Sequence, residues 1–334
     1  MDKRPTLRTI AAATGLAVAT VSRALGDAPD LAAATKDRVR RAAADLGYVR
    51  DRAALRLRTG RTQVIALVMS TEHDMMNHTA RLISSLAGTL RGTPYHLNVT
   101  PFLPGEDPGA PIRRIVEGRL ADAVIFNQTR PEDDRAAWLL ERGFPFATHG
   151  RTDWADRHPW ADYDNEAFGA ICVRRLARAG RRRIVAVAPP AEQAYGGHFA
   201  AGVLRGAAET GAAARLLAVT SDDPGESVAA AVAEALREGA DGVACASTAA
   251  AMAALRAIEA QAPLGLRADL VAKEAIPFLG LVRPGIMALR EDVGRAGAVL
   301  ARAAIRAATE PGAPPLQDLE VPLDADEAVD GRAA

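Results

Sequence analysis

The hydrophobic positions of the first fifty residues recur at helical spacing in three short segments. In the run TLRTIAAATGLAVATVSRAL (residues 6–25), apolar residues repeat every three or four positions on either side of Gly15. Thr6 can cap the first helix, and Gly15 can adopt the positive φ that ends it. The apolar positions from Ala32 to Leu46 predict a third helix. Two short helices joined by a tight glycine-containing turn are typical of a helix-turn-helix unit.

After Gly60 the pattern changes to short apolar runs that alternate with helical segments. This alternation predicts parallel sheets covered by helices. We expect about ten strands, eight of which can be placed at particular residues. That number is more than one twisted sheet holds comfortably, so we expect two doubly wound α/β lobes that face a cleft. The strands are expected at 64–69, 96–99, 123–126, 145–148, 159–163, 184–188, 216–219 and 242–246, and the helices at 79–91, 111–117, 133–142, 166–179, 198–210, 226–238 and 249–261.

Composition excludes several classes of protein. Hydrophobic residues make up 49% of the 334 residues and charged residues 25%, as in a globular protein. No apolar run reaches the roughly 18 residues of a membrane span, and the charged N-terminus does not resemble a signal peptide. Cys172 and Cys245 are the two cysteines, which argues against a disulfide scaffold. We therefore expect a cytoplasmic protein.

The charges are unevenly distributed. The chain carries 41 Lys and Arg against 41 Asp and Glu, but residues 1–62 hold 13 basic and six acidic residues. This segment has a formal charge of +7, and the remainder of the chain −7. A basic head on an acidic body suggests a polyanion as the partner of the head.

The body lacks the sequence motifs of common enzymes. It contains no dinucleotide-binding G-x-G-x-x-G, no P-loop, no H-E-x-x-H and no G-x-S-x-G. His73 and His78 lie near Asp74 in a loop after the first strand, so they form either a metal site or part of a cleft-lining loop. The two cysteines fit buried packing positions better than nucleophiles. We expect no enzymatic activity, cofactor or metal.

Ligands of open α/β sheets bind beyond the carboxyl ends of the strands. The polar segments at these ends can hydrogen-bond a polyol or hold an anion. An alternative for Asp164 and Asn165 is that either caps the helix that follows. The segments are Ser70–Asp74, Asn127–Thr129, His149–Arg151, Asp162–Asn165 and Ser247–Thr248.

About sixty contiguous residues carry a resemblance to a known family. The helix-turn-helix with its VSR ending, the T-x-x-x-V third helix, the LGY segment and the short hinge before a strand resemble the LacI/GalR family of bacterial transcription repressors. The resemblance implies a DNA-binding head, a hinge and a body like the periplasmic binding proteins. It further implies a small-molecule effector between the lobes and a homodimer on a pseudo-palindromic DNA operator.

The resemblance assigns the DNA contacts of the head residue by residue. Val18 and Ala19 match the leading base-reading positions, and Thr20, Ser22 and Arg23 match the contact positions that follow. Thr6, Leu7, Thr35 and Tyr48 match phosphate-contacting or docking positions. Serine often stands in the family where this chain has Ala17 and Ala32, so the second and third helices lack a capping side chain. Asp30 is a candidate cap for the third helix. The expected DNA-binding residues are Thr6, Leu7, Val18, Ala19, Thr20, Ser22, Arg23, Thr35, Tyr48 and Leu57.

Residues 50–61 (RDRAALRLRTGR) read as a basic helix too short to be stable alone, or as a solvated linker. The resemblance implies a hinge helix that forms on the operator. Leu57 then occupies the position that wedges between base pairs in the minor groove. Arg52, Arg56 and Arg58 would neutralise nearby phosphates.

The cleft departs from the pattern of the sugar-binding members. Phe199 stands where those members carry an arginine, in the stretch FAAGV, and Ser247 and Thr248 replace an Asn-Asp pair. The effector can therefore be a sugar, a modified sugar, a sugar acid or another small polar molecule. The residues expected to bind it are His149, Arg151, Asp164, Asn165, Tyr195, Phe199, Thr248 and Lys273.

Together these observations predict a DNA-binding transcriptional regulator, a repressor, switched by a small polar effector. The expected domains are a head at 1–49, a hinge at 50–61 and a body at 62–334. Its first lobe comprises about 62–160 and 291–320, and its second about 161–290 and 321–334. The acidic C-terminal tail lacks the leucine heptads of a coiled coil, so a dimer is expected. The alternative is a stand-alone carbohydrate-binding or carbohydrate-modifying protein with an incidental basic head.

Overall fold

The computed structural model describes residues 5–48, 56, 60–70, 78–103 and 105–323. Two compact units result, Met1–Thr62 and Gln63–Ala334, and each is treated by itself. Within the described residues, no helix is both long enough and apolar enough to cross a lipid bilayer.

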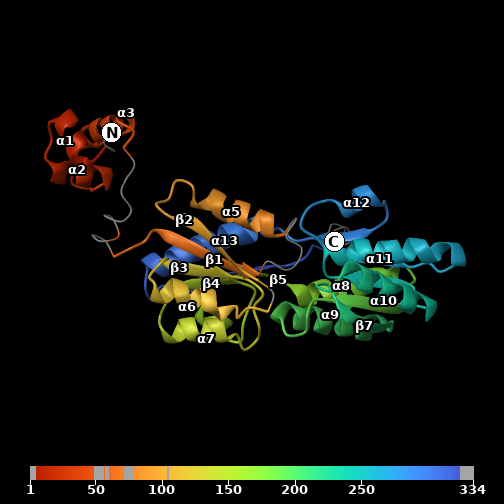
Figure 1. The fold of residues 1–334 in the computed structure, drawn as a ribbon. Coiled ribbons are helices and arrows are strands. Elements are labelled where there is room, and N and C mark those ends of the chain that lie inside the picture. Colours follow the sequence, from red (N-terminus) through yellow and green to blue (C-terminus); the bar gives the residue numbers. More distant parts are fainter. Residues whose placement is uncertain (1–4, 49–55, 57–59, 71–77, 104, 324–334) are drawn as a thin grey trace, which may run out of the picture. The chain divides into compact units, whose positions relative to one another are not determined.

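Residues 5–48 of the first unit, the head, form three helices, α1 (Leu7–Thr14), α2 (Val18–Leu25) and α3 (Ala33–Asp45) (Figure 1). Its core is small, because only five side chains are fully or nearly fully buried among the three helices. These side chains are Ile10, Val21, Ala24, Val39 and Ala43. The predicted helix-turn-helix with a third supporting helix is therefore confirmed.

The first lobe of the body is a six-stranded parallel sheet in the order β11-β5-β4-β3-β1-β2. Helices α5 and α13 cover one face, and α6 and α7 cover the other. The strands are β1 (Val64–Ser70), β2 (His96–Phe102), β3 (Ala123–Phe126), β4 (Phe146–His149), β5 (Trp160–Tyr163) and β11 (Gln317–Glu320), and the helices are α5 (Ala80–Leu90), α6 (Gly109–Glu117), α7 (Asp134–Glu141) and α13 (Val293–Thr309).

The second lobe is a five-stranded parallel sheet in the order β10-β9-β8-β6-β7. Helices α10 and α11 pack on one face, and α8 and α9 on the other. The strands are β6 (Arg183–Ala188), β7 (Ala213–Thr220), β8 (Gly242–Cys245), β9 (Asp269–Glu274) and β10 (Met287–Arg290), and the helices are α8 (Asn165–Arg178), α9 (Ala194–Thr210), α10 (Gly225–Arg237), α11 (Thr248–Gln261) and the short α12 (Leu279–Val282). The expected architecture of two doubly wound lobes is confirmed.

Glycines allow α8 and α9 to pack closely. A Cβ atom at Gly202 would lie 2.0 Å from the carbonyl oxygen of Glu166, and one at Gly169 would lie 2.5 Å from that of Phe199. No side chain fits such distances, so these positions require glycine. Cys172 lies fully buried in this layer and Cys245 in the opposite one. Both cysteines are packing residues, as expected.

The chain passes from the first lobe to the second between β5 and α8, and returns between β10 and α13. The expected boundary at about residue 160 falls inside β5. The whole of β5 stays in the first sheet because it pairs with both β4 and β11. A third passage was expected near 318–322. Strand β11 belongs to the first sheet. Residues 324–334, which were expected to continue into the second lobe, lie outside the described residues.

Candidate DNA-reading face and effector cavity

The three head helices begin in different ways. The Thr6 hydroxyl accepts the backbone N–H of Thr9 and forms a capping box, and Gly15 ends α1 at φ 65°. Helices α2 and α3 begin at Ala17 and Ala32 with no side-chain cap, as the sequence predicts. Asp30 does not cap α3, contrary to expectation. Its carboxylate forms an ion pair with Arg23 instead.

Helix α2 presents one buried and one exposed face. Val21 and Ala24 are fully buried against the other helices, whereas Val18 is 41% exposed. Ala19 and Arg23 are exposed beside it, and Thr20 and Ser22 are half-buried. Small side chains can contact thymine methyl groups, and an arginine can read guanine O6 and N7. The exposed face of α2 therefore has the chemistry of a base-reading helix.

The remaining DNA-binding candidates surround this face or support the head. Thr6 is exposed, and Thr35 is half-buried in the first turn of α3. Leu7 and Tyr48 are half-buried and pack against the head core, so they also serve the fold. Leu57 lies outside the described residues, as do Arg52 and Arg58, whereas Arg56 is described and exposed.

In the body, a cavity of about 150 Å³ lies at the carboxyl ends of the strands of both sheets. Each of the five polar segments predicted at strand ends contributes to its wall. A second hollow of about 660 Å³ adjoins it, because Ser70, Gln128 and Asp222 line both. The first cavity is lined by Ser70, His78, Thr79, Asn127, Gln128, His149, Gly150, Asp162, Asn165, Tyr195, Ser221, Asp222, Ala246, Ser247, Thr248, Lys273, Glu274, Ala275 and Glu291.

Five of the eight expected effector-binding residues line this cavity: His149, Asn165, Tyr195, Thr248 and Lys273. They come from both lobes. Of the two histidines in the loop after the first strand, His78 lines the cavity, and His73 lies outside the described residues together with Asp74.

The other three lie elsewhere. Asp164 caps α8, where its Oδ1 accepts the N–H of Ala167 at 2.9 Å, which confirms the capping alternative. Phe199 is fully buried between α8 and α9, where it stacks on Phe168. Arg151 donates to Asp162 at 2.8 Å and holds that cavity-lining carboxylate in place.

Glu291 is one of the cavity residues outside the predicted segments, as are Ser221, Asp222 and Glu274. It follows β10 directly and is 4% exposed. Lys273 Nζ contacts its Oε2 at 2.9 Å and donates to Asn165 Oδ1 at 3.1 Å. The rule that polar residues follow strand ends would have found Glu291, but the run MALR at 287–290 was not recognised as a strand.

Lys273 and Glu291 are opposite charges in the cavity wall and pair with each other. Burial alone would raise the pKa of the Glu291 carboxyl, but Lys273 and then His78 outweigh it and hold that pKa well below its usual range. Burial lowers the pKa of His149 to about 4, helped by His78 and Lys273 and opposed by Glu291. Burial also raises the pKa of Asp162 despite Arg151. At neutral pH His149 is therefore an uncharged imidazole beside a charged carboxylate.

One polar atom in the cavity wall has no hydrogen-bond donor. Among the described residues, Asn127 Oδ1 is buried without a hydrogen bond. Leaving such an acceptor unpaired costs about 1–3 kcal/mol. A ligand with a hydroxyl or N–H group could supply the missing donor.

Comparison with known proteins decides the family. Residues 6–51 match the model "Bacterial regulatory proteins, lacI family". The chain is 30% identical over 328 residues to the HTH-type transcriptional regulator AglR of Rhizobium meliloti (strain 1021), a match that covers 94% of this chain and 90% of AglR. The chain belongs to the LacI family of bacterial transcriptional regulators. This LacI-family chain is also 33% identical to RafR of Escherichia coli over 192 residues, which cover 57% of the chain and 56% of RafR.

Solved structures of the LacI family show the same fold. A transcriptional regulator CelR–cellobiose complex aligns at a TM-score of 0.69 with 23% identity, covering 96% of this chain and 98% of that one. A lac repressor dimer bound to operator aligns at a TM-score of 0.78 with 18% identity, covering 96% and 97%. The solved structures agree in fold, and the match to AglR shows the family, so the chain is a DNA-binding transcriptional regulator with a helix-turn-helix head and a two-lobed body.

Proposed function

We propose that this protein is a repressor that binds a pseudo-palindromic operator as a homodimer and is switched by a small carbohydrate bound between its lobes. The observation that carries the DNA-binding part is the exposed face of α2 on a basic head. A regulator of this kind acts by binding and not by catalysis. Membership in the LacI family argues against the alternative of a carbohydrate-modifying protein with an incidental head.

Helix α2 reads the bases in the major groove. Val18 and Ala19 offer small surfaces for thymine methyl groups, and Arg23 offers a guanidinium for guanine. Arg23 is paired with Asp30 in the free protein, with side chains 52% and 58% exposed. An exposed pair of this kind contributes about 0–1 kcal/mol, so Arg23 can leave Asp30 for a base at little cost.

Other parts of the head position α2. Thr6, Leu7, Thr35 and Tyr48 dock the head on the phosphate backbone. Leu57 of the hinge wedges into the minor groove at the centre of the operator. Two heads are needed for such a site, and a homodimer supplies them.

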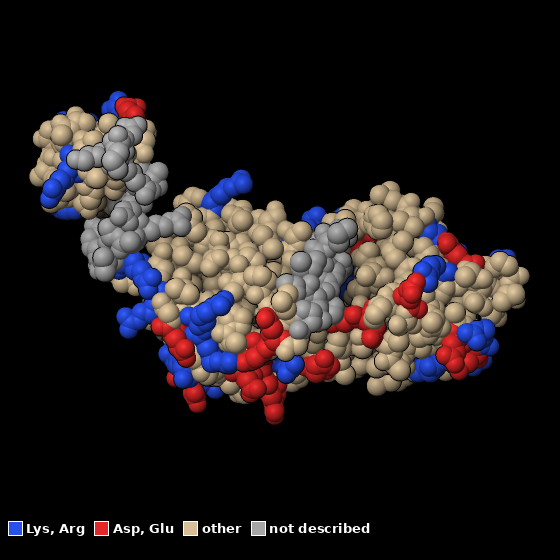
Figure 2. Space-filling model, viewed as in Figure 1, with Lys and Arg blue, Asp and Glu red and all other residues tan. Residues whose placement is uncertain are grey.

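The positive charge of the head is not repeated on the visible face of the body. Lys and Arg side chains are interspersed there with Asp and Glu among large uncharged areas (Figure 2). An extended phosphate backbone is therefore expected to bind the head and not this face of the body.

The effector is an uncharged di- or oligosaccharide. Lys273, the cation that lines the cavity, is already paired with Glu291, and the cavity carboxylate of Asp162 is paired with Arg151. An anionic ligand would compete with these carboxylates, whereas sugar hydroxyls can donate to them and accept from Lys273. The adjoining 660 Å³ hollow leaves room for more than one sugar ring. The structural neighbour CelR was solved in complex with cellobiose.

The first test is the selection of bound sequences from random duplex DNA with the purified full-length protein. An enriched inverted repeat is expected, and non-specific binding should weaken steeply as salt rises, because about six phosphates are neutralised. Absence of an enriched repeat, both alone and with sugar pools added, would refute the operator proposal. A flat salt response would do the same.

The carbohydrate is tested on the operator so identified. Cellobiose, maltose and raffinose are compared with glucuronate for their ability to change operator affinity. A response to a neutral sugar alone is expected. A response to glucuronate alone would show that the cavity recognises an anion.

A further inference from the structure

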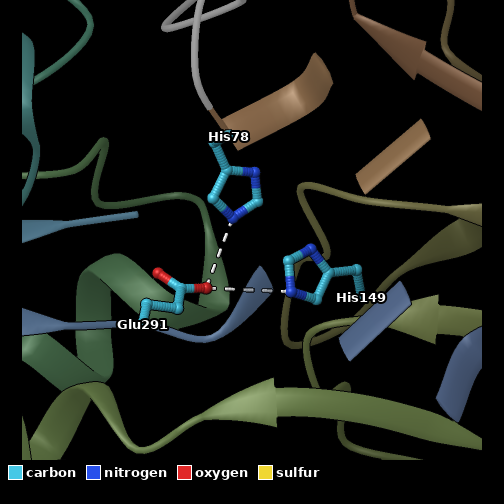
Figure 3. Close-up of side chains that lie close together, drawn as sticks. All are labelled: His78, His149 and Glu291. Carbon is cyan, nitrogen blue, oxygen red and sulfur yellow. Dashed lines mark hydrogen bonds and ion pairs between the residues drawn. The ribbon is translucent and has the colours of Figure 1, made fainter. Parts of the chain in front are cut away.

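Three potential metal ligands converge at the wall of the inter-lobe cavity. His78 lies two residues before α5, His149 ends β4, and Glu291 follows β10 at the return from the second lobe to the first (Figure 3). Their nearest ligand atoms all lie within 4.8 Å of one another. The three side chains come from segments 71 and 142 residues apart along the sequence, so the tertiary fold alone brings them together.

His78 contacts Glu291 at hydrogen-bonding distance but His149 does not, and the spacing of the three ligand atoms is close to that of a metal site. His78 Nε2 lies 3.3 Å and His149 Nε2 lies 3.9 Å from the same carboxylate oxygen, Glu291 Oε1. The second distance is too long for a hydrogen bond. Two ligands about 2.0–2.1 Å from a tetrahedral zinc ion lie roughly 3.4 Å apart. An ion between the three would therefore draw His149 about half an ångström closer to Glu291, and would bring the ligand nitrogens of the two histidines, which lie within 4.8 Å of each other, to about the same separation.

The surroundings prepare these groups for coordination. The rings of His78 and His149 stack at 5.2 Å with 22° between their planes, and both direct a nitrogen to Glu291 (Figure 3). Side-chain exposure is 27% for His78, 10% for His149 and 5% for Glu291, so bulk water competes weakly. Lys273 contacts the other carboxylate oxygen, Oε2, at 2.9 Å and leaves Oε1 to the histidines. A hydrogen-bonded outer partner of this kind fixes the orientation of a metal-ligating carboxylate.

We propose that His78, His149 and Glu291 bind one divalent transition-metal ion, with Zn²⁺ as the best match. Two imidazoles and a carboxylate form the N₂O set found in zinc sites that keep a position open. The open position faces the cavity, where a hydroxyl of an effector or a water molecule can complete the coordination. The positive charge of nearby Lys273 weakens the site without blocking it, because Lys273 contacts the oxygen that the metal does not use.

The test uses untagged full-length protein stripped with EDTA and dialysed into metal-free buffer. Zn²⁺ is titrated against a chromophoric chelator without DNA or sugar. One Zn²⁺ per chain is expected, with at least tenfold weaker binding in His78→Gln and in His149→Gln. His96→Gln is the matched control, because His96 is exposed on β2 of the same lobe and is not a member of the cluster of His78, His149 and Glu291. Its affinity should equal that of the wild type.

Three results would overturn the site. They are no stoichiometric binding by the wild type, unchanged affinity in both cluster variants, or an equal loss in His96→Gln. If a cluster variant does not fold, Co²⁺ binding to the wild type decides. Intense visible absorption of a four-coordinate site supports the proposal, and the weak spectrum of hydrated Co²⁺ refutes it. The outcome is independent of the DNA selection, so either proposal can fail while the other stands.

Discussion

The uncapped starts of α2 and α3 allow a direct test of how stability of the head governs DNA binding. Ala17 has φ −60° and ψ 144°, and Ala32 has φ −57° and ψ 140°. Both have the extended ψ that a capping residue needs, and both side chains are exposed. A serine at either position can accept the backbone N–H two or three residues further on. The double variant Ala17→Ser/Ala32→Ser should therefore gain two caps with no other change.

The expected gain follows from the two missing hydrogen bonds. Each cap contributes about 1 kcal/mol, so the double variant should be about 2 kcal/mol more stable in the head. This corresponds to roughly a 30-fold shift of the opening equilibrium. The gain is large relative to a head whose core consists of five small or medium side chains. Operator affinity should rise by no more than the factor by which the folded fraction of the head rises.

This gain can be measured by hydrogen exchange in the full-length protein. Mass spectrometry follows the exchange in peptides that span α2 and α3. Exchange should slow by up to about 30-fold in the double variant. The control is Ala44→Ser, the same chemical change at an exposed position inside α3. It should speed exchange slightly, because serine has a helix propensity about 0.5 kcal/mol worse than alanine. Exchange that is unchanged or faster in the double variant would refute the capping argument.

Three further predictions concern the operator and the body. Leu57→Ala should weaken operator binding far more than binding to non-specific DNA in a filter or anisotropy assay, and equal losses would show that Leu57 is no wedge. Arg23→Ala should cost about 1–3 kcal/mol and relax preference at one base pair, whereas a uniform loss across sequences would mark a phosphate contact. Asp133→Ala should lower body stability by about 3–5 kcal/mol in calorimetry, because it leaves the buried guanidinium of Arg135 without its carboxylate partner. Burial raises the pKa of Asp133, but Arg135 and backbone N–H groups lower it further, so this stabilisation is present above about pH 4 and is lost as pH falls through the lower native value. A wild-type advantage that persists unchanged well below that pH would contradict the assignment.

The head shows how far local signals reach. Apolar spacing around Gly15, the cap at Thr6 and the absence of caps at Ala17 and Ala32 were all readable, and the structure agrees with each. These features depend on residues within one or two helical turns. Asp30 was misassigned because its choice between capping α3 and pairing with Arg23 depends on how α2 and α3 are placed.

The cavity shows the same division. The rule of strand ends located all five polar segments, because every strand in both sheets is parallel and its carboxyl end is fixed by chain direction. It could not say which side chains of a segment turn inward. Helix α9 begins at Ala194, four residues earlier than expected, which places Tyr195 at the cavity and Phe199 one turn further along, in the core.

Sequence alone thus determined the kind of protein: a basic helix-turn-helix head, a two-lobed α/β body and the region where a ligand binds. Periodicity, caps and strand direction are local properties, so they do not depend on how the helices and strands pack together. The meeting of His78, His149, Lys273 and Glu291 was decided by tertiary structure alone. The distances between these side chains depend on how the two sheets and their connections are placed. That placement cannot be deduced from the spacing of the residues along the sequence.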